Sequence, residues 1–135
     1  MDERRKDHRR DATFSLRNLL RIRSERRNYA LAVLGTAEGL VMAGSREDDL
    51  AKMTAAQVSL RLFKAPEEAP FGRFTKSGLG KRVSGVRFEI DGNELFLAVV
   101  DEHGSADERD DDVLLDELAE RVHDIITQQR QRAAA

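Results

Sequence analysis

Three histidines are the side chains of this chain best suited to acid–base chemistry, and none has a nucleophile beside it. His8 lies in a charged N-terminal segment, His103 in an acidic stretch and His123 in a helix-like C-terminal segment. The chain has no cysteine, which excludes disulfides, thiolate metal sites and cysteine nucleophiles. Because no spacing of residues builds an activated nucleophile or a metal site, we predict that the protein is not an enzyme and binds no metal or cofactor.

Two further segments contain residue types that bind phosphate or calcium in other proteins, but in the wrong order. Residues 78–81 (Gly-Leu-Gly-Lys) lack the full spacing of a phosphate loop, Arg82 replaces its hydroxyl residue, and a strand rather than a helix is predicted to follow. Residues 101–112 lack the alternating ligands and closing glutamate of a calcium loop. We predict no nucleotide at the first segment, and a solvated loop or a helix cap at the second.

Charge is distributed very unevenly along the chain. Residues 1–27 hold ten Lys or Arg and five Asp or Glu, a balance of +5, whereas residues 101–124 hold two Arg and eleven Asp or Glu, a balance of −9. Such opposed patches favour association with oppositely charged surfaces. The basic end does not predict a nucleic-acid partner, because Phe14 and Tyr29 are its only nearby aromatic residues and no nucleic-acid-binding motif is present.

Length and composition indicate one domain with charged flanks. The 135 residues suit a single core, and hydrophobic residues, 40% of the chain, are clustered rather than dispersed. No apolar run has the length of a membrane span, and the N-terminal residues lack the apolar segment of a secretory signal, so we expect a cytoplasmic protein. We predict a disordered or loosely helical basic N-terminus over residues 1–12, a folded domain over 13–127 and a flexible tail over 128–135.

A helix followed by a buried hairpin is predicted for the first third of the chain. From Thr13 onward, leucines recur at helical spacing on one side: Leu16, Leu19 and Leu20. This short apolar stripe favours packing on a sheet over binding to an anionic membrane surface. The apolar runs 30–34 and 40–43 then flank a turn ending in Glu38 and Gly39, where glycine can adopt a positive φ. Both runs are apolar on both faces, so helices are expected above and below them.

A second helix is predicted after the hairpin. Ser45 and Asp48 have the spacing of an N-terminal cap. The helix that follows carries small residues that would allow another helix to approach closely: Ala51, Ala55, Ala56 and Ser59. These residues suit either contact with a second copy of the chain or ordinary packing on the protein's own sheet.

The second half of the chain predicts a strand, a hairpin and a helix. Pro66 and Pro70 mark a break, after which residues 71–77, with Phe71 and Phe74, suit a short edge strand.

Residues 83–90 alternate between apolar and polar, Asp91-Gly92 is the strongest turn signal, and residues 95–100 are apolar. The last helix has one apolar stripe: Leu114, Leu115, Leu118, Val122, Ile125 and Ile126.

This order of elements, and above all the segment 29–44 with its two strands, tight Glu38-Gly39 turn and following helix, resembles the roadblock (dynein light chain-like) family. The resemblance covers residues 16–126; the family usually has aspartate where Glu38 stands. It implies an α+β fold, a roadblock/profilin-like antiparallel five-stranded sheet with helices on both faces. Profilin-like and longin-like domains share much of this architecture, so topology alone does not select the family.

The resemblance also implies a function. Roadblock domains dimerise and often dock on small Ras-like GTPases, so we expect a non-catalytic homodimer that regulates or localises such a GTPase. The alternative is a self-associating adaptor or scaffold subunit without a GTPase partner. The residues expected at the dimer interface are Ala51, Ala55, Ala56, Ser59, Phe71 and Phe74. The residues expected to dock the partner are Arg17, Arg21 and Arg23, which could instead only solvate a helix.

Overall fold

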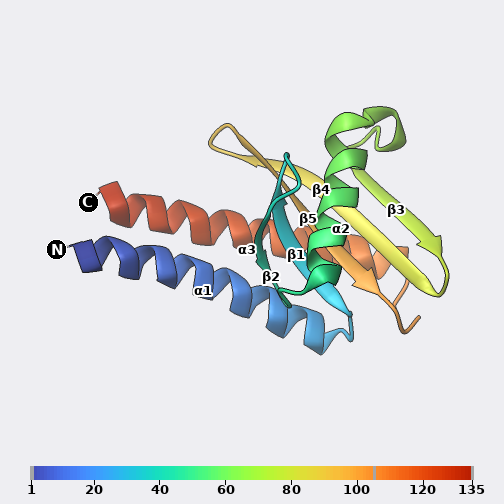
Figure 1. Cartoon of the computed structure of the whole chain (residues 1–135), viewed down its shortest axis with the longest axis horizontal. Coiled ribbons are helices and arrows are strands. Elements are labelled where there is room, and N and C mark those ends of the chain that lie inside the picture. Colours follow the sequence, from blue (N-terminus) through green and yellow to red (C-terminus); the bar gives the residue numbers. More distant parts are fainter. Residues whose placement is uncertain (1, 105, 135) are drawn as a thin grey trace.

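The computed structural model describes residues 2–104 and 106–134, with side chains for residues 12–65, 67–104 and 106–132. The chain forms helix α1, strands β1 and β2, helix α2, two short irregular helical turns, strands β3, β4 and β5, and helix α3 (Figure 1). Their bounds are α1 Asp2–Arg26, β1 Leu31–Thr36, β2 Val41–Gly44, α2 Asp49–Ser59, η1 Leu60–Lys64, η2 Pro66–Glu68, β3 Arg73–Gly78, β4 Lys81–Ile90, β5 Asn93–Asp101 and α3 Glu108–Ala134.

The strands form one five-stranded sheet in the order β2-β1-β5-β4-β3, and every neighbouring pair is antiparallel. The central strand β5 pairs with β1 from Leu31 opposite Val100 to Thr36 opposite Leu95. The short strand β2 and the strand β3 form the two edges. The α+β fold with a five-stranded antiparallel sheet is therefore confirmed.

Helices cover both faces of this sheet, as expected for strands that are apolar on both sides. Helices α1 and α3 lie side by side on one face, and α2 crosses the other (Figure 1). Along β1, Ala32 and Leu34 point toward α1 and α3, whereas Leu31 and Val33 point toward α2. The alternation of side chains along an extended strand thus divides the core into two layers.

The turns bear out the predictions made from their glycines. Gly39 closes the β1–β2 connection with a φ of +90°. Asp91 and Gly92, with φ values of +50° and +82°, form a two-residue turn between β4 and β5. Two consecutive positive φ angles are typical of the primed turns that match the twist of a hairpin.

Residues 78–81 lie at the β3–β4 hairpin, where Leu79 and Gly80 form the turn with φ values of +53° and +77°. A strand follows them, as the sequence indicates, in place of the helix that follows a phosphate loop.

Helix α1 begins at Asp2 and α3 continues to Ala134. Both end segments are rich in residues with high helix propensity and contain no glycine or proline. One detail differs from the sequence-based expectation. Asp48, not Ser45, caps α2, and its carboxylate accepts a hydrogen bond from the Ala51 amide. The Ser45 hydroxyl accepts a hydrogen bond from the Ala32 amide instead.

None of the described helices is long and apolar enough to cross a membrane.

Candidate functional site

Helix α2 has a buried side and an exposed side, and the two carry different residues. Ala51 and Ala55 have no exposed surface and pack on the sheet with Val58. Met53 and Ala56 lie on the solvent side of the same helix. The small residues therefore let α2 approach its own sheet closely. Of the two roles that the sequence left open, contact with a second copy or packing on the protein's own sheet, Ala51 and Ala55 have the latter.

The residues expected at a dimer interface consequently separate into two groups. Ala51, Ala55 and Ser59 are buried inside the chain, and the Ser59 hydroxyl donates to the Ala56 carbonyl oxygen. They are positioned to hold the helix on the sheet and are not open to a partner. Ala56 and Phe71 are exposed, and Phe74 is half-buried against the α2 side of the core.

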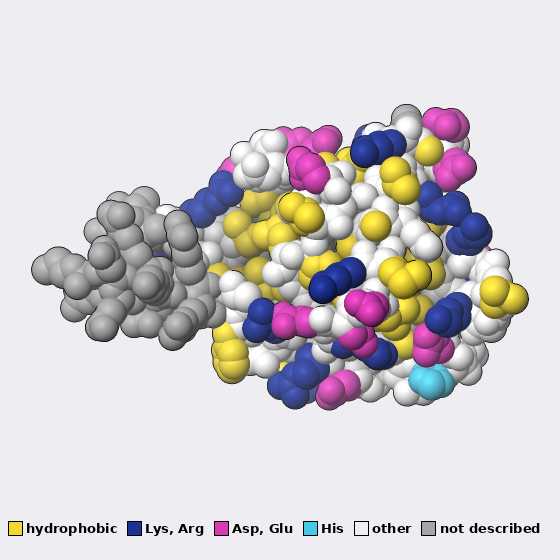
Figure 2. Space-filling view, in the orientation of Figure 1, with side chains coloured by type: hydrophobic (Ala, Val, Ile, Leu, Met, Phe, Trp, Pro, Cys, Tyr) yellow, Lys and Arg dark blue, Asp and Glu magenta, His cyan; other side chains and the backbone are white. Residues whose placement is uncertain are grey.

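An exposed surface lies where α2 and η1 meet the β3–β4 hairpin, and we call it the α2–β3 face. It carries four large apolar side chains that are mostly or fully exposed: Met53, Leu60, Phe71 and Leu79. Figure 2 shows hydrophobic side chains gathered over this part of the molecule. Leu60 and Leu79 line one groove together, and exposed apolar side chains that lie together usually mark a contact surface.

A groove of about 700 Å³ runs through the α2–β3 face, between η1 and the hairpin. Leu60 and Leu79 line it together with Phe74, whose ring lies 5.7 Å from the Arg61 guanidinium. The strand β3 beside it is an edge strand, so one row of its backbone groups faces no other strand of this chain. The face thus combines apolar side chains with an open sheet edge.

A second cluster of interest is polar and lies inside the molecule. Asp111, at the start of α3, has no exposed surface and accepts four hydrogen bonds from three side chains, and we call this group the Asp111 cluster. The Tyr29 hydroxyl donates at 2.5 Å, the Ser84 hydroxyl at 2.6 Å, and Arg82 donates through Nε at 2.6 Å and Nη2 at 2.8 Å. Arg82 Nη2 also lies 3.0 Å from Asp101 Oδ2.

The electrostatics of the Asp111 cluster favour a single charge state. Burial raises the pKa of Asp111, but hydrogen bonds from Arg82, Ser84 and Tyr29 outweigh it and bring the pKa below the usual value for aspartate. Burial and the hydrogen bond to Asp111 raise the pKa of the Tyr29 hydroxyl, so this group keeps its proton. The cluster therefore stays as one carboxylate with neutral tyrosine.

The Asp111 cluster is closed to chemistry with an outside molecule. Among the described residues, no buried side-chain nitrogen or oxygen lacks a hydrogen-bond partner, and no group of carboxylates and histidines could hold a metal ion. A catalytic carboxylate needs a free lone pair or an exchangeable proton near a substrate. The arrangement joins α3 to β4 and to the connection between α1 and β1, which is a stabilising role.

Solved structures share the arrangement of most of the chain. MglB with a tetrameric arrangement superposes with a TM-score of 0.66 at 16% sequence identity, covering 87% of this chain and 92% of the other. The gliding protein MglB from Thermus thermophilus gives a TM-score of 0.66 at 15% identity, over 87% and 92%. A roadblock/LC7 domain from Streptomyces avermitilis gives 0.64 at 18% identity, over 81% and 95%. The chain has the roadblock fold.

No family model matches the sequence of this chain, and no curated protein matches it. At identities below a fifth, the likeness to these structures shows the fold, and a fold alone does not determine the function.

The three arginines expected to contact a partner protein differ in whether an acidic side chain of this chain already pairs with them. Arg17 is paired with Glu47 at 2.5 Å, and Arg23 lies 4.0 Å from Glu117. Arg21 is exposed and donates a hydrogen bond to the Asn18 side chain. Of the three, only Arg21 has no acidic partner among the residues described, so it retains the most uncompensated charge.

The Asp111 cluster was not predicted from the sequence. A solvated loop was one of the two structures expected for residues 101–112, but Asp101 and Asp111 are both buried. The expectation of a helix cap suits Asp107, whose carboxylate accepts from the Asp110 amide at the start of α3. One signal was available: Ser84 and Arg82 are polar residues on the strand face that continues with the core residue Val86. His103 and His123 are exposed, and the His8 side chain lies outside the described residues.

Proposed function

We propose that this protein forms a homodimer through the α2–β3 face and binds a small Ras-like GTPase, which it regulates or localises in the cytoplasm without catalysing a reaction itself. The observation that carries the proposal is the α2–β3 face, where the exposed Leu60 and Leu79 line a groove beside the open edge strand β3. The roadblock fold supports the choice of partner, because roadblock domains dimerise and often dock on small GTPases.

Two copies related by a two-fold axis would bury this face efficiently. Antiparallel pairing of β3 with its copy would supply partners for the backbone groups of the sheet edge and extend the sheet across the axis. The same arrangement would bring Met53 and Leu60 of the two α2–η1 segments together and remove them from water. Burial of apolar surface is the main driving force of such association.

Light scattering across a range of micromolar concentrations tests the dimer. We expect twice the mass of one chain for the wild type and a shift toward monomer for Met53→Lys, which places a charge in the contact. Phe14→Lys is the matched control, because Phe14 is equally exposed but lies on α1, away from the face. A wild type that stays monomeric would refute the dimer, and equal behaviour of the two variants would refute its location.

A capture experiment tests the GTPase. The immobilised protein is incubated with lysate of its source organism in the presence of GDP or a non-hydrolysable GTP analogue, and the retained proteins are identified by mass spectrometry. We expect a Ras-like GTPase whose retention depends on the nucleotide. Retention of other proteins only, independent of nucleotide, would favour the adaptor or scaffold without a GTPase partner.

A further inference from the structure

The edge strand β3 is flanked by the two most exposed large apolar side chains among the residues described. Phe71 precedes the strand and is 89% exposed, and Leu79 follows it and is fully exposed. Each lies four residues along the chain from Thr75, in the middle of the segment. The two apolar residues are therefore placed symmetrically about Thr75.

The backbone groups on the open side of β3 follow from its pairing with β4. The turn between the two strands has two residues, which in such a hairpin makes the flanking pair Gly78–Lys81 a hydrogen-bonded one. Bonded and non-bonded pairs alternate along an antiparallel ladder. The bond from the Arg87 amide to the Gly72 carbonyl oxygen, at 2.8 Å, belongs to the same row. The outward-pointing amides and carbonyls of β3 are consequently those of residues 73, 75 and 77.

This alternation limits how two copies of β3 can pair about a two-fold axis. Because outward groups occur at every second residue, the axis must pass at a residue and not between two residues. With the axis at Thr75, Arg73 lies opposite Ser77 of the second copy, and residues 72–78 are all paired. An axis at any other residue of β3 pairs a shorter stretch of the strand.

Side-chain chemistry also favours an axis at Thr75 over its two neighbours. An axis at Lys76 would place two lysines directly opposite each other, which destabilises a strand pair. An axis at Phe74 would leave the last two residues of β3 unpaired and would separate Leu79 from Phe71 of the second copy. An axis at Thr75 instead places Lys76 opposite Phe74, where a cation and an aromatic ring attract each other.

We propose that the homodimer has its two-fold axis at Thr75 and that Leu79 of each copy packs against Phe71 of the other. The proposal rests on the proposed homodimer and adds the residues that select its register. Four residues on either side of the axis bring position 79 of one copy opposite position 71 of the other. The contact forms twice, once at each end of the strand pair, and removes from water the two apolar side chains that the single chain exposes most.

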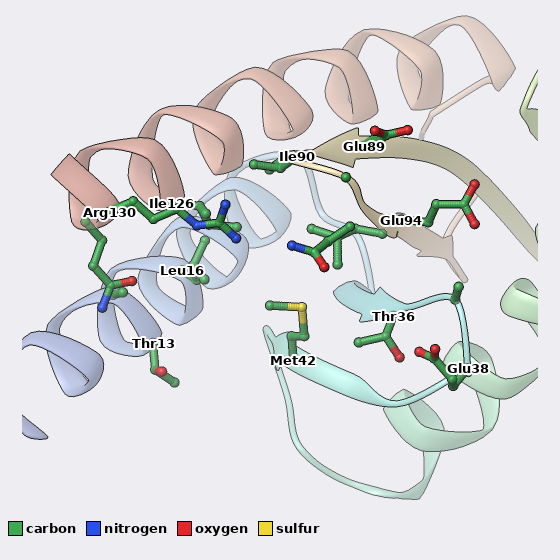
Figure 3. Close-up of a pocket in the computed structure, with 16 residues that line it drawn as sticks. Thr13, Leu16, Thr36, Glu38, Met42, Glu89, Ile90, Glu94, Ile126 and Arg130 are labelled. Atoms are coloured by element: carbon green, nitrogen blue, oxygen red, sulfur yellow. The ribbon is translucent and has the colours of Figure 1, made fainter. Parts of the chain in front are cut away.

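The other edge strand, β2, is less suited to such pairing. It has four residues, against six in β3, and α1 packs beside it. Its Met42 lines a groove of about 850 Å³ between the two long helices and the tips of the β1–β2 and β4–β5 hairpins, together with Leu16, Ile90 and Leu95 (Figure 3). This groove shares no lining residue with that of the α2–β3 face. Met42 is therefore a control position away from the proposed contact.

Disulfide trapping tests the register, because the chain has no cysteine of its own. Thr75→Cys places two thiols at the axis, where the Cα atoms of a hydrogen-bonded pair are about 5.5 Å apart, within the range of a disulfide. Phe74→Cys and Lys76→Cys are the matched controls, since an axis at Thr75 leaves each of them diagonal to its own copy, about 7–8 Å away. Under mild oxidation we expect Thr75→Cys to form a covalent dimer at least about tenfold faster than either control.

Complementary charges test the contact between Leu79 and Phe71. Leu79→Asp and Phe71→Lys each remove both contacts from their own homodimer, and each should raise its dissociation constant by about tenfold or more. Aspartate tolerates the positive φ at position 79. A heterodimer of the two variants keeps one original contact and places aspartate against lysine in the other. In analytical ultracentrifugation we expect it to be tighter than either variant homodimer, whereas positions that do not touch would give an intermediate value.

Leu79→Asp mixed with Met42→Lys is the control, because it carries the same two charges without the contact. Its heterodimer should be intermediate between the two homodimers, and circular dichroism confirms that each variant is folded. Faster cross-linking of Phe74→Cys or Lys76→Cys than of Thr75→Cys would overturn the register. An intermediate heterodimer of Leu79→Asp with Phe71→Lys would overturn the contact. Light scattering of the wild type separates these failures from that of the homodimer: a dimeric wild type confines the error to the register, and a monomeric wild type refutes both proposals.

Discussion

The Asp111 cluster and the α2–β3 face place opposite kinds of side chain in opposite environments. In the cluster, a carboxylate without exposed surface receives hydrogen bonds from Tyr29, Arg82 and Ser84. On the face, large apolar side chains such as Leu79 and Phe71 project into solvent. The cluster finds its partners within the chain, whereas the face does not. The residues of the Asp111 cluster therefore hold the roadblock fold together, whereas those of the α2–β3 face are available for association.

The largest expected effect is on the cluster. Asp111→Asn should lower the free energy of unfolding by about 3–5 kcal/mol, because it leaves the nearly buried Arg82 guanidinium without its main counter-charge. Chemical denaturation at fixed protein concentration measures this change. Asp112→Asn is the control: its ion pair with Arg73 is half exposed, so a change within about 0.5 kcal/mol is expected. Equal effects of the two substitutions would contradict a special role for the buried carboxylate.

The next largest effect is expected for Leu79→Asn, which should stabilise the folded monomer but weaken self-association. Leu79 is fully exposed at a positive φ, which asparagine adopts more readily than leucine. Leu79→Asn should stabilise the monomer by about 0.5–1 kcal/mol and weaken self-association by about 1.5–3 kcal/mol, the value of one buried leucine. Thermal unfolding at low concentration and analytical ultracentrifugation separate the two. If Leu79→Asn leaves association unchanged, the turn is not part of the contact.

The third prediction concerns acid. Because the folded pKa of Asp111 is lowered, its stabilisation is fully present above the unfolded value of about 3.9 and is lost as the pH falls through the folded pKa. The difference in unfolding free energy between the wild type and Asp111→Asn should therefore shrink as the pH falls below about 4. Denaturant titrations at a series of pH values measure it. A difference that stays constant down to the acid transition would show that the charge of Asp111 is not what stabilises the fold.

The smallest effect is expected for the exposed arginines of α1. Reversing Arg21 to glutamate should slow association with a GTPase or other acidic partner, and reduce its salt dependence, while the fold and the dimer stay intact. Arg121→Glu on α3 is the matched control, because Arg121 is also exposed and has no ion pair with any described residue. Stopped-flow association at low salt distinguishes the two. An unchanged rate for Arg21→Glu would mean that this side chain only solvates the helix.

Most of the fold could be predicted because it follows from local sequence patterns, namely apolar runs and turn residues. Apolar runs on both sides of Gly39 identified a hairpin that needs helices on both faces, and Asp91-Gly92 identified the turn at which β4 returns as β5. The resemblance to roadblock domains rested on these same segments. Residues 71–77 were expected at a sheet edge, and β3 is an edge strand.

The surfaces were harder to predict. Periodicity placed Ala51, Ala55 and Ala56 on one helix and marked them as small, but it could not say whether the chain's own sheet or another molecule covers them. The structure buries Ala51 and Ala55 and exposes Ala56, so the open part of α2 is the side with Met53. A helix pattern identifies a face, and only the packing of the other elements decides which face is used.

The sequence by itself determined the order of the elements, their turns and the two-sided core, because hydrophobic periodicity and backbone preferences act between residues close along the chain. Only the tertiary structure decided that Asp111, Arg82 and Tyr29 meet and that Ile90 and Leu95 line one groove with Leu16 of α1. These groups come from segments far apart in the sequence. Their contacts depend on how β4, β5 and the helices pack in space. The sequence around a charged residue does not show whether that residue is buried with a partner or exposed to solvent.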